Sequence, residues 1–326
     1  MSRFARICVI STVILALLAV TVIGAAVWLG IGLTNGTTSP PEESSSQEVT
    51  STSPNPQTST VTSTIPETLE GMAKILGPHD ADGIPDLTPQ PGEHPMFRVL
   101  TWAKHELPRV ESIRDYSAIF TKQEQIDGKV SDPVRLSLKY RQNPVSIYVH
   151  YEEPSKDAGV EAIYKETSET PAGKGKMWGH GVGLERWAGT LELDPTGMIA
   201  MRGQRYPITE IGILRMLRLF IEIGSKDLGY GECTVTYTPE VMWRDRRCAQ
   251  LEIIHPTKRD YFRFHRAIIR IDRELLLPVA YESYDWALDA SGQPLLLESY
   301  SYEKVQLNNG FTDDDFSTKN ESYDFP

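Results

Sequence analysis

Histidine and acidic side chains, the usual ligands of metals and carriers of protons, are scattered along this chain. His255 and His265 come closest to a pair that neighbouring strands could bring together, but no third ligand accompanies them. Structural zinc sites use four closely spaced ligands, so we expect the two imidazoles to be solvated or hydrogen-bonded. Asp313, Asp314 and Asp315 lack the alternating oxygen ligands of a calcium loop. We therefore predict no metal and no cofactor.

Catalytic signatures are also missing from the sequence. It contains no G-x-S-x-G nucleophile elbow, no phosphate-binding glycine loop and no H-E-x-x-H motif. The glycine-rich run over 179–183 has no clear strand before it, so we expect a mobile loop there, with a lid or ligand loop as the alternative. The sequence predicts that the protein is not an enzyme.

Cys233 and Cys248 are the two cysteines in the part of the chain that we expect to fold. An even number of cysteines outside the cytoplasm favours a disulfide. A plausible turn lies between them, so a bridge would cross a hairpin and close a loop of about 15 residues, contributing about 3 kcal/mol. We predict a disulfide between Cys233 and Cys248, and metal binding by the pair is the alternative.

Large apolar side chains on the predicted strands and on one helix are the candidates for a binding function. Gathered on one side of a sheet beneath a helix, they would line an apolar cavity. They would otherwise fill an ordinary core, as strand aromatics do, and the residues alone leave both interpretations open. The candidates are Tyr116, Phe120, Tyr148, Tyr164, Leu214, Leu217, Phe262, Phe264 and Tyr281.

The elements that must position these side chains are mostly strands. Alternation of apolar and polar residues begins at Tyr116 and recurs in short segments separated by turn signals. Pro207–Gly224 has helical spacing and an apolar face so wide that it must be covered. Another helix is predicted over Met96–Ile113, with a kink or break at Pro108. Eight or more strands with two or three helices predict an α+β domain whose large antiparallel sheet curls toward a barrel.

The N-terminus has a different composition. Arg3 and Arg6 precede Ile7–Leu33, a run of 27 residues without a charged side chain. A helix of that length measures roughly 40 Å and a bilayer core about 30 Å, and the positive-inside rule keeps the N-terminus in the cytoplasm. We predict that residues 1–33 form a cytoplasmic stub and a single-pass signal anchor in the cytoplasmic membrane; a cleaved signal peptide is the alternative. The remainder then faces the periplasm or the cell exterior.

Residues 34–91 differ in composition from both neighbouring segments. Between 34 and 66, 22 of 33 residues are Ser, Thr or Pro, a composition that buries too little apolar surface to fold. We predict a disordered linker over 34–91 and one folded domain over 92–326. Residues 34–326 carry a net charge of −13, because the −11 of the whole chain includes Arg3 and Arg6. This acidic balance argues against nucleic acid or anionic lipid headgroups as partners.

Three passages of the folded part have a pattern known from other proteins. They are Ser112–Gln123 after the first helix, Pro133–Tyr140 with Ser146–Pro154, and Leu307–Asp313 followed by Phe316 and Asn320. In order and spacing they resemble the DUF1571 family of planctomycete-type envelope proteins, whose function is unknown, and more distantly the LolA and RseB type of periplasmic lipoprotein carrier. The resemblance implies an unclosed β-barrel covered by helices and, from the carriers, an apolar cavity that accepts acyl chains.

Two functions are expected from these observations. The first is a membrane-anchored extracytoplasmic binding protein that holds a lipid or acylated ligand in an apolar cavity, with a lipid or lipoprotein as its partner besides the membrane. The second is a structural or signalling interaction module of the cell envelope with no small-molecule ligand. The retained anchor and the long linker favour local handling of a ligand near the membrane over a freely diffusing shuttle.

Overall fold

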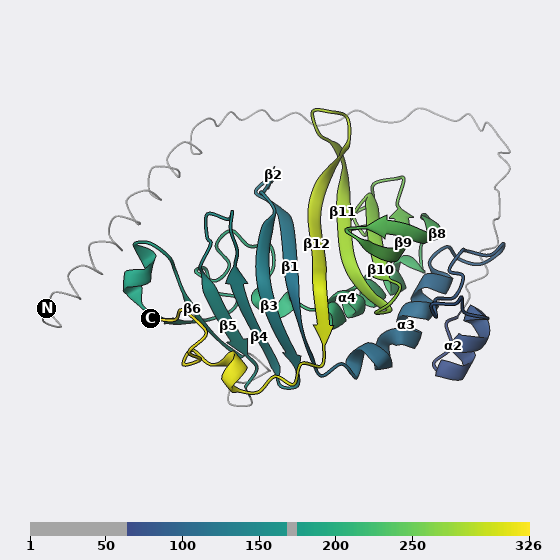
Figure 1. The fold of residues 1–326 in the computed structure, drawn as a ribbon. Coiled ribbons are helices and arrows are strands. Elements are labelled where there is room, and N and C mark those ends of the chain that lie inside the picture. The colour runs from purple at the N-terminus through teal and green to yellow at the C-terminus, as the bar shows by residue number, and fades with distance from the viewer. Residues whose placement is uncertain (1–63, 168–174) are drawn as a thin grey trace, which may run out of the picture. The chain divides into compact units, whose positions relative to one another are not determined.

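The computed structural model describes residues 64–167 and 175–326 (Figure 1). The predicted membrane anchor over 1–33 and the first part of the predicted linker lie outside these residues. No helix within the described ranges combines the length and the apolar character that crossing a membrane requires.

A single antiparallel sheet of twelve strands forms the body of the described residues. The strands are β1 (Asp115–Ile126), β2 (Lys129–Val130), β3 (Val134–Gln142), β4 (Val145–Tyr151), β5 (Glu161–Lys165), β6 (Lys176–His180), β7 (Leu191–Leu193), β8 (Thr234–Trp243), β9 (Arg246–Ile254), β10 (Arg266–Asp272), β11 (Leu277–Leu288) and β12 (Pro294–Leu307). Their order is β7-β6-β5-β4-β3-β1-β12-β11-β10-β9-β8, and β2 pairs with β1 off this path. β7 and β8 end the order without pairing with each other, so the sheet is unclosed, as predicted.

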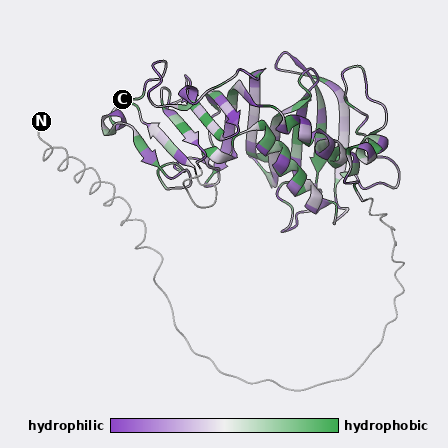
Figure 2. Ribbon diagram, turned by 90° about the horizontal axis from the view of Figure 1, so that it is seen from below, coloured by the Kyte–Doolittle hydropathy of each residue, from purple (hydrophilic) through white to green (hydrophobic). Residues whose placement is uncertain are grey.

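Three α-helices among the described residues pack on one another, and α4 lies against one face of this sheet. They are α2 (Leu69–Leu76), α3 (Phe97–Glu111) and α4 (Ile213–Asp227). α2 packs on α3, α3 packs on α4, and α4 contacts β11. α3 and α4 approach closely at Gly224, where a Cβ would lie 2.8 Å from side-chain atoms of Leu100 and Met96. Figure 2 shows hydrophobic and hydrophilic bands alternating along strands and helices, the pattern of elements with one buried side.

We call the face of the sheet that α4 covers the inner face, and the opposite one the outer face. The main hydrophobic core lies on the inner face. A second, smaller cluster contains Tyr148, Ile163 and Phe316. Tyr148 and Ile163 alternate along β4 and β5 with core residues such as Val149 and Ala162, so the second cluster lies on the outer face.

The helix α3 runs through Pro108 without a break, which excludes one of the two predicted outcomes, a break, and leaves a kink. Its last turn is held by contacts that the sequence does not reveal. The Arg109 guanidinium donates to the Leu275 carbonyl at 3.2 Å, Val110 is buried, and the Ser112 N–H bonds back to the Pro108 carbonyl at 3.1 Å. These interactions outweigh the lost backbone hydrogen bond.

Two other segments have boundaries that differ from the prediction. The helix predicted over Pro207–Gly224 is a 3-10 turn, η3 (Ile208–Glu210), followed by α4, which extends to Asp227. The loop expected over 179–183 begins inside β6, where His180 is buried.

The folded body begins earlier than the sequence predicted. Residues 64–91 were assigned to the linker, yet they contain α2, whose first turn is capped by the Thr68 hydroxyl accepting the Gly71 N–H at 3.2 Å. Their Pro-, Gly- and Asp-rich composition is typical of a linker, yet five of their apolar residues lie in the core. These residues are Ile65, Met72, Leu76, Ile84 and Leu87.

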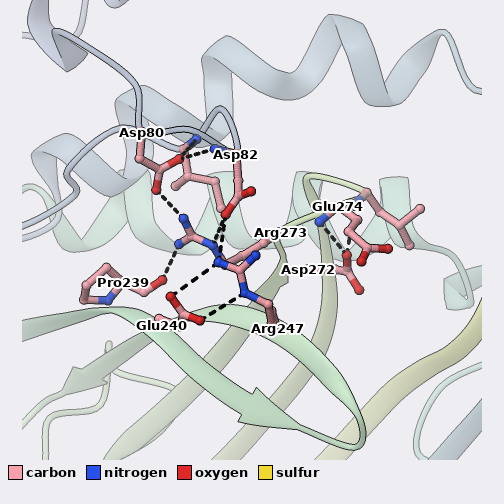
Figure 3. A network of polar contacts seen from close by, with 10 residues as sticks. Asp80, Asp82, Pro239, Glu240, Arg247, Asp272, Arg273 and Glu274 are labelled. Atoms are coloured by element: carbon pink, nitrogen blue, oxygen red, sulfur yellow. Dashed lines mark hydrogen bonds and ion pairs between the residues drawn. The ribbon is translucent and has the colours of Figure 1, made fainter.

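A polar network fastens this early segment to the sheet (Figure 3). The buried Arg273 guanidinium lies 2.7 Å from the Asp82 carboxylate and 2.5 Å from the Asp80 carboxylate. Arg247 of β9 lies 3.2 Å from Asp82 and 3.0 Å from Glu240 of β8. The chain before α3 is thereby tied to the β8–β9 hairpin and to the end of β10.

The predicted disulfide is not formed, because Cys233 and Cys248 are both free and buried. The hairpin register explains this. Cys248 lies opposite Val241, whereas Thr234, the neighbour of Cys233, lies opposite Ile254. The two cysteines are therefore near opposite ends of the ladder, separated by roughly 20 Å at about 3.3 Å per residue, and a disulfide requires Cα atoms within about 7 Å.

Candidate functional site

Two cavities lie between the inner face and its cover. The smaller, of about 50 Å³, lies between α4 and the strands β9, β10 and β11. The larger, of about 130 Å³, lies between strands β1, β3–β6 and β12 and the segment 195–211, which leads into α4. Both are lined by Met216, Leu219, Tyr281 and Glu298. The two cavities therefore adjoin along α4.

Cross-strand pairs build the wall of the larger cavity. Side chains on the same face recur every second residue, and the register of β1 and β12 aligns three such pairs. The pairs are Phe120 with Tyr302, Lys122 with Tyr300, and Glu124 with Glu298. On β11, Tyr281 lies beside Tyr300. The wall thus changes from aromatic to charged over three successive pairs.

Two tyrosines at the aromatic end fix the start of α4. The Tyr116 hydroxyl accepts the Ile213 N–H at 3.0 Å, and the Tyr302 hydroxyl accepts the Gly212 N–H at 2.9 Å. These bonds satisfy two donors that the first turn of a helix leaves open. Burial raises the pKa of both phenols, so they act as neutral hydroxyls. Gly212 has φ +143°, and a Cβ there would lie 2.9 Å from the Tyr140 ring, so this position requires glycine.

Two buried carboxylates face each other at the charged end. Glu124 and Glu298 are direct neighbours in the β1–β12 ladder, an unfavourable arrangement of like charges by itself. The Tyr300 hydroxyl donates to Glu124 at 2.7 Å, and the Arg205 N–H donates to Glu124 at 3.2 Å. The Arg205 Nε lies 3.0 Å from Glu298 Oε2 as an ion pair without the alignment of a hydrogen bond. The Lys122 ammonium lies 3.5 Å from Glu124.

The segment 204–206 closes this end of the cavity. Gln204 accepts a hydrogen bond from the Lys122 ammonium and donates to the Tyr151 hydroxyl at 3.3 Å. Burial lowers the pKa of Lys122, although Glu124 opposes that shift. The charged end therefore places positively charged hydrogen-bond donors and negatively charged acceptors next to an apolar space.

The opposite end of the smaller cavity is bordered by Asp227, the last residue of α4. Asp227 is buried, and its Oδ2 lies 3.4 Å from Nε2 of the buried His255. The His255 Nδ1 lies 3.1 Å from the Phe264 carbonyl, so this nitrogen carries a proton. His94 is also buried, and desolvation lowers its pKa, although the Asp227 charge opposes that shift. The contact between Asp227 and His255 brings the end of α4 to the residue after β9.

The candidate residues named from the sequence lie in different surroundings. Four line the cavities: Phe120, Leu217, Phe264 and Tyr281. Three pack in the inner core without lining either cavity: Tyr116, Tyr164 and Leu214. Phe262 stacks on His255 with ring centroids 3.9 Å apart. Tyr148 lies in the outer cluster, away from both cavities.

Sequence reasoning missed the charged part of the site. Lys122 and Glu124 continue the alternation that begins with Phe120, so the same periodicity could have placed them on the inner face. Glu298 and Tyr300 have the same relation on β12. The segment 195–211 carries no periodic signal that would have found it.

The acidic run near the C-terminus contacts basic side chains. The Asp313 carboxylate lies 2.7 Å from Arg141, and the Asp315 carboxylate lies 3.1 Å from Lys139. His265 Nδ1 lies 3.0 Å from the His255 carbonyl. Among residues 64–167 and 175–326, no three His, Cys, Asp or Glu side chains are gathered so that they could hold a metal ion.

The family model described as a protein of unknown function, DUF1571, matches residues 113–325. None of the curated proteins matches the chain.

Several solved structures are similar to the chain at low sequence identity. A putative outer membrane lipoprotein-sorting protein domain from Vibrio parahaemolyticus has 11% identity and a TM-score of 0.32, over 67% of this chain and 95% of that chain. A LolA superfamily protein from Nitrosomonas europaea has 12% identity and a TM-score of 0.27, over 66% and 97%. The lipoprotein LppX from Mycobacterium tuberculosis has 8% identity and a TM-score of 0.35, over 66% and 97%.

Proposed function

We propose that this chain, which belongs to the DUF1571 family of proteins of unknown function, binds a lipid or an acylated ligand in the adjoining cavities of its inner face. The observation that carries the proposal is the apolar space that α4 and the segment 195–211 leave above the sheet. Strand aromatics that merely filled a core would leave no such space.

The size of the larger cavity supports a ligand with an apolar part. An engineered apolar cavity of about 150 Å³ in another protein binds benzene, and the larger cavity here has about 130 Å³. It therefore suits about six carbon atoms. Burying six methylene groups contributes roughly 5 kcal/mol, which corresponds to more than about a thousandfold in affinity. A longer chain requires α4 or the segment 195–211 to move away from the sheet.

The charged end sets a second requirement for the ligand. Lys122 and Gln204 line the larger cavity there and carry hydrogen-bond donors, and Glu124 and Glu298 carry acceptors. An acyl chain lying along the aromatic wall would bring its polar end to these groups. The ligand is thus an amphiphile, with its apolar part inside and its polar part at the segment 204–206.

The site of action is inferred from the sequence. Residues 7–33 are proposed to anchor the protein in the cytoplasmic membrane, with the folded domain in the periplasm or at the cell exterior. A binding protein held in this way would receive its ligand from, or deliver it to, the membrane that anchors it.

The experiment enlarges a side chain that lines both cavities and measures the effect on ligand binding. The chain segment 58–326, which contains the described domain, would be purified without detergent and titrated with a fluorescent fatty acid. In Leu219→Trp a larger side chain replaces one that lines both cavities, and we expect at least about tenfold weaker binding, the equivalent of two lost methylene contacts.

Leu288→Trp is the matched control, because Leu288 is exposed at the end of β11. It should bind like the unaltered protein. If the unaltered protein binds no fatty acid and carries no lipid in native mass spectrometry, the proposal fails. A structural or signalling module without a small ligand would then be the better interpretation.

A further inference from the structure

Four large apolar side chains project into solvent from one short stretch of the chain. The exposed fractions are 87% for Leu184, 90% for Trp187, 92% for Met198 and 67% for Ile199. We call these four residues the apolar tip. Trp187 lies in η2 (Glu185–Ala188), Leu184 precedes it, and Met198 and Ile199 follow β7, at the end of the sheet beyond β6 (Figure 1). Exposure this high means that the four side chains do not cover one another.

The backbone beneath the apolar tip is held in place. The Arg186 guanidinium lies 2.7 Å from the Asp324 carboxylate, and the Thr190 hydroxyl donates to the Pro326 carbonyl at 3.3 Å. The turn before Met198 is closed by the Gly197 N–H, which donates to the Asp194 carbonyl at 2.9 Å. The side chains are therefore presented outward by a tied loop.

Two residues of the apolar tip are sequence neighbours of residues that line the larger cavity. Pro195, Ala200 and Gln204 line that cavity, and Met198 and Ile199 lie between them in the sequence. One segment thus contacts the apolar interior and also carries the exposed side chains. An apolar molecule entering beside this segment would meet exposed hydrophobic residues first and the cavity next.

Charge around the apolar tip gives no attraction to an anionic surface. Between residues 184 and 202, Glu185, Glu192 and Asp194 oppose Arg186 and Arg202, a net charge of −1. The chain as a whole carries −11. A surface that binds here must be held by apolar contact, and an electrically neutral lipid surface fits this requirement. Tryptophan is the side chain that membrane interfaces favour.

We propose that the apolar tip inserts into a lipid surface with uncharged or zwitterionic headgroups, next to a segment that lines the larger cavity. A fluid lipid layer adapts to four side chains that project separately, whereas a protein partner would need a hollow fitted to each of them. Insertion goes beyond the proposed function, because the cavity can bind an amphiphile whether or not the tip touches a membrane.

The test reads the surroundings of Trp187 in the full chain. The chain would be reconstituted in phosphatidylcholine vesicles with brominated acyl chains, which quench only tryptophans in contact with lipid. The emission of Trp187 is the difference between the unaltered protein and Trp187→Phe. We expect lipid bromines to remove most of this emission, and aqueous iodide to leave it largely intact.

Two further variants make the readout specific. Met198→Ser combined with Ile199→Ser should reduce the lipid quenching of Trp187 several-fold. Met242→Ser is the matched control, because Met242 is 68% exposed on β8, at the opposite end of the strand order, and it should leave the quenching unchanged.

Two results would overturn the proposal. In one, iodide quenches Trp187 as it quenches an indole in water, while lipid bromines have no effect. In the other, Trp187 is shielded from both quenchers and cross-linking gives a discrete dimer, which would make the apolar tip an interface between two copies. Fatty acid binding by residues 58–326 is measured without vesicles, so failure of the proposed function is recognised separately.

Discussion

Strands β3 to β6 are covered on both faces, and the two covers fit the sheet differently. On the outer face the C-terminal segment 308–326 runs across the strands (yellow in Figure 1). Its Tyr323 stacks on Tyr148 with ring centroids 3.9 Å apart, and Phe316 has almost no exposed surface. The buried Glu161 accepts the Tyr148 hydroxyl at 2.7 Å and a backbone N–H of the same segment at 2.8 Å.

The inner face of the same strands is covered by the segment 195–211, and space remains beneath it. Val149, Ala162 and Met177 line the larger cavity there. Ala162 and Ile163 are adjacent in β5, yet Ile163 is fully packed on the outer face while Ala162 borders the cavity. Both faces carry apolar side chains, so the fit of the covering segment decides whether a face becomes a solid core or a binding site.

The largest predicted change in stability, which tests the difference in packing between the two faces, comes from removing the Phe316 side chain. Phe316→Ala removes a fully buried ring from the outer face and should lower the free energy of unfolding by about 3–5 kcal/mol, measured by urea denaturation. Met177→Ala, on the cavity wall, should cost less than about 2 kcal/mol, because its side chain already borders a void. Equal losses would mean that the two faces are packed alike.

The second prediction compares the change in stability when either of two alanines on the inner face is replaced by leucine. Ala118→Leu adds volume to the filled core around β1 and should lower the free energy of unfolding by about 1–3 kcal/mol. Ala162→Leu adds the same volume beside the larger cavity and should change stability by less than about 1 kcal/mol, while fatty acid binding weakens by at least about tenfold. Thermal unfolding and the fatty acid titration measure the two quantities. If Ala162→Leu destabilises as much as Ala118→Leu, the cavity does not accept additional atoms.

The antiparallel sheet and the covering helix were predictable, because each is encoded in local periodicity. Alternation from Tyr116 onward predicted β1, and the wide apolar face of 207–224 predicted α4 within a few residues. The unbroken α3, the buried residues of 64–91 and the separated cysteines were not predictable. Each depends on contacts between distant segments, such as Arg109 with Leu275, or on the register of one hairpin.

The site was partly predictable for the same reason. Alternation identifies which strand residues share a face, but it does not tell which face will be covered loosely. Tyr148 and Phe120 have similar sequence surroundings; Phe120 borders the larger cavity and Tyr148 packs under the C-terminal segment. The deciding elements are 195–211 and 308–326, which contain no strand or α-helix, only short 3-10 turns, and whose sequences do not show how closely they pack.

The smallest predicted change in stability concerns the contacts that hold the C-terminal segment 308–326 on the outer face of the sheet. Asp315 lies 3.1 Å from Lys139 of β3 and accepts the Thr312 N–H at 2.9 Å. Burial alone would raise the pKa of Asp315, but the Thr312 N–H and the Lys139 ammonium outweigh it and lower the pKa below its ordinary value of 3.8. A carboxylate whose pKa is lower in the folded state contributes stability above about pH 3.8, and that contribution is lost as the pH falls through the folded value.

Asp315→Asn should therefore lower the free energy of unfolding by about 1 kcal/mol at neutral pH, and the difference from the unaltered protein should shrink as the pH falls below about 3.8. Hydrogen exchange in the segment 308–326 at pH 6 should become faster in this variant, while exchange in 195–211 stays the same. Glu321→Gln is the matched control, since Glu321 is exposed on the same segment. Faster exchange in both 308–326 and 195–211 would mean that the two segments open together. They would then not be bound to the sheet independently, contrary to the comparison made above.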